Sequence, residues 1–185
     1  MIVNKCSENL LKKSKKLYEN YRDNCTVVQR MLEKYKKIYP NIYDYSIMHF
    51  IDIAEFCDLI MDRKKLEGLN EDECYCLLLA ALFEHTGFGL NQEIMNRYIN
   101  RLGIQKQTQS LTFLQIMSKY HVLFSACLIE EYGDIFEFPS EIHKHAITSM
   151  LYFIGGNSDV INQLEEILVL DNKNKIGRAS CRERV

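Results

Sequence analysis

The chain has 185 residues, of which 47% are hydrophobic and 26% charged, and it contains only 8 Gly and 2 Pro. This length and composition predict one globular domain with a sizeable core, and they exclude a linker-rich or disordered chain. The net charge of −2 argues against a nucleic-acid-binding protein.

We expect neither an extracellular nor a membrane protein. The longest apolar run, Cys74 to Phe83, has about ten residues where a membrane span needs roughly twenty, and the N-terminus shows no signal-like apolar segment. The 7 Cys stand singly in apolar patterns, without the spacing of a zinc or disulfide framework. These features predict reduced thiols in a cytoplasmic protein.

Helical patterns follow one another with almost no strand pattern between them. Ser7 is expected to cap a first helix that runs to about Tyr21, and Thr26 a second one that stops at Pro40. A third helix is expected over residues 45–63, where apolar residues recur at spacings of three and four.

The second half of the chain continues the helical pattern. Asn70 and Glu73 have the spacing of a capping box, and they open a helix that is apolar on all sides and ends at Gly87. Further helices are expected from Asn91 to Gly103, from Thr108 or Ser110 to Gly133, from Ser140 to Gly155, and after Ser158. The predicted fold is a single compact all-α domain of several helices over residues 1–175.

The last ten residues differ from the rest. Residues 176–185 show no helical or strand period and carry three Arg against one Glu. They look like the translation of a common sequencing adapter, and we expect a non-native tail that takes no part in the fold. A natural basic tail is the alternative.

Three of the five histidines point to a site. His49, His85 and His121 each lie in or beside a separate apolar helix, and Asp52 and Glu84 lie close to the first two. Histidines and carboxylates from several helices form the ligand set of hydrolytic divalent-metal sites. A histidine on an apolar face is more often an ordinary core residue, and this alternative stays open.

The sequence around these histidines resembles a known family. Residues 40–53, PNIYDYSIMHFIDI, resemble the nPYHNxxHAxDV signature of the class I 3′,5′-cyclic-nucleotide phosphodiesterase catalytic domain, within the HD-type metal phosphohydrolases. Residues 77–92, LLLAALFEHTGFGLNQ, resemble its LxAALxHDxDHxGxxN. Residues 119–121, 133–136 and 151–156 fall at its later ExHH, DIF and ATDM motifs.

The resemblance implies an all-α phosphodiesterase fold that is incomplete at its C-terminal end in this chain. It also implies a divalent metal (Zn, Mg or Mn), a cyclic nucleotide as substrate, and either further C-terminal helices or a second copy to cover the domain. Nucleic-acid and membrane partners are not expected.

Carried over by position, the family roles fall on a few residues. His49 matches the first metal-ligating His, and Asp52 the Asp of HAxDV. Tyr45 falls on the proton-donor His, and a phenol matches neutral pH less well than an imidazole does. His121 matches the second His of ExHH, a residue expected to contact substrate or support the ligands.

Two alignments compete at the second motif. In one, His85 is a supporting His and Ala81 and Leu82 stand at the His-Asp ligand pair. In the other, Glu84 and His85 themselves occupy the pair, with Glu84 as a metal ligand.

Three functions therefore remain open. The first is a phosphodiesterase-like domain whose catalysis is impaired because Tyr45 and the altered His-Asp pair replace the usual groups. The second is an active, divergent phosphohydrolase that holds one metal with His49, Glu84 and His85. The third is a non-enzymatic helical interaction module.

Overall fold

The computed structural model describes residues 5–38 and 67–156, and every regular element in these two ranges is helical. The all-α prediction is confirmed for this part of the chain. None of the described helices is both long and apolar enough to cross a membrane. The elements are α1 (Lys5–Lys13), α2 (Lys15–Ile38), α5 (Glu71–Phe83), η1 (Thr86–Gly89), α6 (Gln92–Arg101), α7 (Gln105–Thr108), α8 (Phe113–Tyr132), η2 (Gly133–Phe136) and α9 (Glu141–Ile154).

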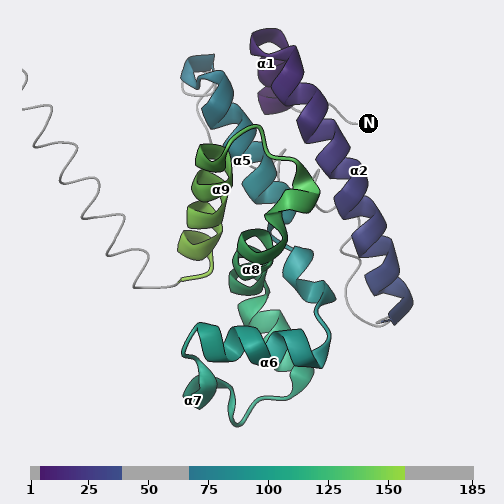
Figure 1. The fold of residues 1–185 in the computed structure, drawn as a ribbon, viewed down its shortest axis with the longest axis vertical. Coiled ribbons are helices and arrows are strands. Elements are labelled where there is room, and N and C mark those ends of the chain that lie inside the picture. Colours follow the sequence, from purple (N-terminus) through teal and green to yellow (C-terminus); the bar gives the residue numbers. More distant parts are fainter. Residues whose placement is uncertain (1–4, 39–66, 157–185) are drawn as a thin grey trace, which may run out of the picture.

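Helix α5 is the centre of the described fold. It packs against α1 and α2 on one side and against α9 on another, as Figure 1 shows. Helix α8 packs against α9 and against the short helix η1, and α6 crosses the far end of α8, at the bottom of the view. The end of α5 is therefore brought against α8.

The sequence of α5 explains its central place. Asn70 and Glu73 form the predicted capping box, in which the Asn70 side chain accepts from the Glu73 N–H at 2.9 Å and the Glu73 carboxylate accepts from the Asn70 N–H at 2.8 Å. Eight of its residues are buried, so apolar side chains on every face meet neighbouring helices. The predicted capping box and the predicted apolar character on all sides are confirmed.

The boundary between the first two helices was predicted in the wrong place. Helix α2 runs unbroken from Lys15 to Ile38, and the break falls at Ser14, whose hydroxyl accepts from the Leu17 N–H at 3.4 Å. Thr26 lies inside α2 and its hydroxyl donates to the Arg22 carbonyl at 3.2 Å. A threonine can bond back into its own helix in this way, and here it does not cap a new one.

The cap of α8 also differs from the prediction. Thr112, with Gln115, forms its capping box, whereas Thr108 ends α7 by donating to the Ile104 and Gln105 carbonyls. The predicted caps Asn91 of α6 and Ser140 of α9 are confirmed. The helices predicted over 45–63 and after Ser158 lie outside the described residues.

Candidate functional site

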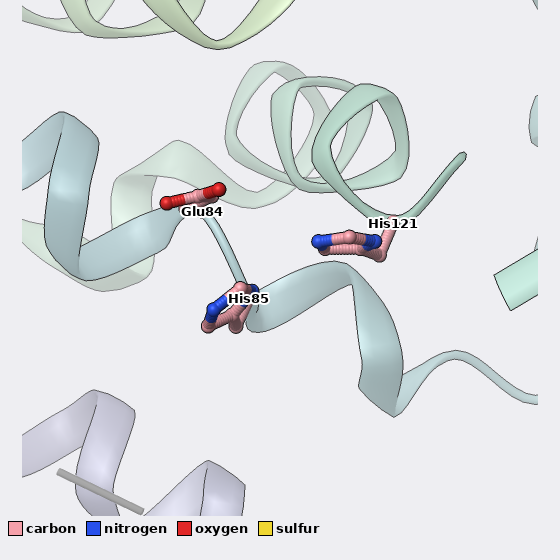
Figure 2. A group of neighbouring side chains, drawn as sticks. All are labelled: Glu84, His85 and His121. Atoms are coloured by element: carbon pink, nitrogen blue, oxygen red, sulfur yellow. The ribbon is translucent and has the colours of Figure 1, made fainter. Parts of the chain in front are cut away.

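Glu84, His85 and His121 come together where the end of α5 meets α8. One ligand atom from each of the three lies within 4.8 Å of the others, and all three side chains are half-buried. Figure 2 shows Glu84 and His85 on the turn after α5 and His121 on α8. The sequence separates His121 from the other two by more than thirty residues, so the fold builds this group.

The turn that carries Glu84 and His85 is fixed to α8 by one serine. The Ser125 hydroxyl donates to the Glu84 carbonyl at 2.8 Å and accepts from the Gly87 N–H at 2.7 Å. Thr86 is fully buried and donates to the Phe83 carbonyl at 2.8 Å. Because these backbone groups are paired, the turn holds a defined position relative to α8.

Gly87 allows this turn to approach α8 closely. A Cβ at residue 87 would lie 2.0 Å from the His121 backbone oxygen and 2.8 Å from the Ser125 nitrogen. The prediction placed Gly87 at the end of the preceding helix, but α5 ends at Phe83 and Gly87 lies inside η1. Its role here is the close contact between two backbones.

The ring of His121 is held from two sides. Its Nδ1 lies 3.0 Å from the Ser118 carbonyl oxygen, which can only accept, so Nδ1 carries the proton. The Phe88 ring stacks on it with centroids 4.2 Å apart, and the His85 ring lies 5.1 Å away. Burial lowers the pKa of His121, so the neutral ring is favoured and its Nε2 lone pair is available as a ligand atom.

The predicted site residues have different outcomes. Glu84 and His85 lie together, and His121, expected to contact substrate or support the ligands, lies beside them. Tyr45, His49 and Asp52 lie outside the described residues, so their roles stay predictions. Ala81 and Leu82, the alternative pair, belong to the apolar α5, where Leu82 is buried.

Two residues at the site were not found from the sequence. Ser125 fixes the turn and the Ser118 carbonyl orients His121. Ser125 is fully buried in an otherwise apolar stretch of α8. A buried hydroxyl needs a hydrogen-bond partner, so the single serine in this apolar stretch was the sequence signal that could have revealed its role.

The chain matches no known family model, no curated protein and no solved structure.

Proposed function

We propose that the chain is a phosphodiesterase-like helical domain that binds one divalent cation at Glu84, His85 and His121 and hydrolyses phosphodiesters slowly. The convergence of the three ligand atoms within 4.8 Å carries this proposal. The resemblance of residues 40–53 and 77–92 to cyclic-nucleotide phosphodiesterase signatures supports the substrate class. Cyclic AMP and cyclic GMP are the first substrates to test.

The donor set fits a borderline divalent cation. Two imidazole nitrogens and one carboxylate are the ligands that zinc accepts in catalytic sites, where a fourth position stays open for water or substrate. The hydrogen bond from His121 Nδ1 to the Ser118 carbonyl leaves Nε2 for the metal. Such outer contacts orient a ligating histidine.

A bound cation would polarise the phosphate and lower the pKa of a coordinated water. The chain contributes positioning, because Ser125 fixes the Glu84 turn and Phe88 stacks on His121. Tyr45, which falls on the proton-donor position of the resembled family, would protonate the leaving oxygen. A phenol with an ordinary pKa of about 10 does so less readily at neutral pH than a histidine, which supports a slow reaction.

The test combines metal binding with hydrolysis. Purified protein is titrated with Mn²⁺, Co²⁺ and Zn²⁺ by calorimetry, and hydrolysis of cyclic AMP, cyclic GMP and bis-p-nitrophenyl phosphate is measured with each metal. We expect one cation per chain and metal-dependent turnover. Both should be lost in Glu84→Gln and His121→Gln, and retained in His145→Gln, which changes an exposed histidine of α9.

The possible results separate the three functions. One cation without turnover on any of these substrates would contradict the proposed hydrolysis and favour a phosphodiesterase-like domain without catalytic activity. Absence of a stoichiometric cation would overturn the proposal and favour an interaction module. A cobalt complex with thiolate charge-transfer absorption would place the metal on cysteines and would also contradict it.

A further inference from the structure

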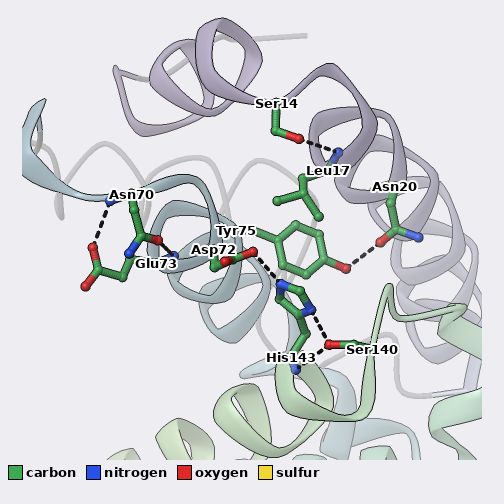
Figure 3. A network of polar contacts seen from close by, with 9 residues as sticks. All are labelled: Ser14, Leu17, Asn20, Asn70, Asp72, Glu73, Tyr75, Ser140 and His143. Atoms are coloured by element: carbon green, nitrogen blue, oxygen red, sulfur yellow. Dashed lines mark hydrogen bonds and ion pairs between the residues drawn. The ribbon is translucent and has the colours of Figure 1, made fainter.

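A second group of reactive side chains lies at the other end of α5. The Asp72 carboxylate lies 2.8 Å from Nε2 of His143, and the Ser140 hydroxyl lies 2.8 Å from Nδ1 of the same ring. Figure 3 shows the three side chains in a continuous row. Asp72 and Glu84 are twelve residues apart, which is about 18 Å along a helix, so this group is separate from the candidate metal site.

The hydrogen bonds of this row have a defined direction. A carboxylate only accepts, so the proton between Asp72 and His143 sits on Nε2 of the ring. Nδ1 of a neutral ring then has no proton, and the Ser140 hydroxyl donates to it. The ring is therefore placed to take the proton of the Ser140 hydroxyl, as nucleophilic activation of a serine requires.

The surroundings hold the His143 ring in this orientation. The Tyr75 ring contacts it in a T-shaped arrangement, with centroids 5.1 Å apart and planes at 84°. The Tyr75 hydroxyl in turn donates to the Asn20 side chain on α2. The His143 side chain is only 13% exposed, whereas that of Asp72 is 64% exposed. The ring is thus fixed while the carboxylate stays in water.

An apolar pocket opens beside the row. Its volume is about 550 Å³, in the range of small-molecule pockets. Asp72, Ser140 and His143 belong to its wall, and the remaining wall residues are mostly apolar. Those apolar residues are Leu69, Cys76, Leu77, Ile142, Ala146 and Met150. A hydrocarbon chain in this space would place an attached polar group near the Ser140 hydroxyl.

We propose that Ser140 is the nucleophile of a second activity, the hydrolysis of esters of apolar carboxylic acids. His143 is its general base and Asp72 the group that orients the ring and stabilises its protonated form. The apolar pocket takes the acyl chain. This proposal stands independently of the cation site.

The reaction balances without a cofactor. The Ser140 oxygen bonds to the ester carbonyl carbon while its proton passes to Nδ1 of His143, and the carbonyl electron pair moves onto its oxygen. When the tetrahedral adduct collapses, the ester bond breaks and the leaving alkoxide takes the proton from Nδ1. Water repeats the two steps on the acyl-serine, which releases the acid and restores Ser140.

The position of Ser140 assists the first step. Ser140 precedes the first residue of α9, and the first backbone N–H groups of a helix have no acceptor within it. The N–H of the residue after a nucleophilic serine is a common donor to the developing oxyanion. In this chain that residue is Glu141.

Ser140 also caps α9, since its hydroxyl accepts from the His143 N–H at 3.4 Å. A capping role alone requires neither the base nor Asp72, and asparagine caps a helix equally well. Ser140→Asn therefore keeps the cap and removes the nucleophile, which separates the two roles.

The test uses an alkyl fluorophosphonate and p-nitrophenyl octanoate on the full chain in the presence of a chelator. We expect one label per chain, located on Ser140 by peptide mass spectrometry. Ester hydrolysis should fall about a hundredfold or more in Ser140→Asn and in His143→Gln, the usual range for loss of a nucleophile or its base. Ser110→Ala, at an exposed serine, should behave as the parent chain.

The pocket provides a second readout. Ala146→Phe fills part of its wall, so octanoate ester hydrolysis should fall at least tenfold relative to that of the acetate ester. Circular dichroism of each variant shows that the helices are intact. Absence of label on Ser140, or equal hydrolysis by Ser140→Asn and the parent chain, would overturn the proposal.

Discussion

The backbone oxygen of His121 lies where a side chain at Gly87 would have to be, 2.0 Å from the ideal Cβ position. The nearest obstacles are backbone atoms of α8, which cannot move without shifting the helix. The candidate cation site depends on this contact, because Glu84 and His85 lie three and two residues before Gly87 in the same turn. The absence of a side chain at Gly87 therefore allows the turn with Glu84 and His85 to lie close to His121 on α8.

Gly87→Ala should destabilise the fold by about 1–3 kcal/mol, the usual cost of overpacking. It should also weaken cation binding, because the turn must move away from His121. Gly68→Ala is the matched control, since nothing lies within 4 Å of its Cβ position. Urea unfolding and metal titration of both variants check this. Equal stability of the two variants would contradict the structural role of Gly87.

Ser125→Ala should cost about 1–3 kcal/mol of unfolding free energy, because it leaves the Glu84 carbonyl and the Gly87 N–H without their hydroxyl partner. Ser110→Ala, at an exposed position, should change the unfolding free energy by less than about 0.5 kcal/mol. Urea denaturation measures both. If the two variants unfold alike, Ser125 does not fix the turn.

Three helix starts were predictable from a local signal. At each of them the side chain of the capping residue accepts a hydrogen bond from a backbone N–H of the first turn, and spacing alone reveals such contacts. The three capping residues are Asn70, Asn91 and Ser140. Thr26 has the same local signal but lies inside α2, which packs along α5. Packing of α2 against α5 favours a helix that continues through Thr26, and no local sequence pattern predicts this packing.

The site was predictable only in part for the same reason. Glu84 and His85 are adjacent in sequence and were expected to act together. The place of His121 beside them follows from the contact between α8 and η1, which Gly87 and Ser125 make possible. A sequence shows which groups can bind a cation, whereas distant packing decides which of them meet.

Alkaline pH should weaken the fold through two thiols. Burial raises the pKa of Cys25 and of Cys76 from 9.0 to about 11. Between these two values the unfolded chain releases the thiol protons and the folded chain keeps them, so the unfolding free energy falls as pH rises from 9 to 11. Below the lower value this contribution is constant.

The double variant Cys25→Ala, Cys76→Ala should show a shallower loss of stability over that alkaline range. Urea unfolding at a series of pH values, compared with the parent chain, measures the difference in slope. Identical slopes would show that these thiols do not keep their protons in the folded state.

Gly89 differs from Gly87 in what it faces. A Cβ there would lie 1.1 Å from the Tyr35 ring, and burial raises the pKa of this tyrosine from 10.0 to about 12. In Gly89→Ala the ring can swing outward, so the variant should lose less stability than Gly87→Ala.

The Tyr35 hydroxyl would then leave the Thr86 carbonyl, 3.3 Å away, and its pKa should fall toward 10.0 because solvent stabilises the phenolate. Ultraviolet titration of Gly89→Ala with and without Tyr35→Phe isolates this one phenol, and a pKa that stays near 12 would show that the ring has not moved.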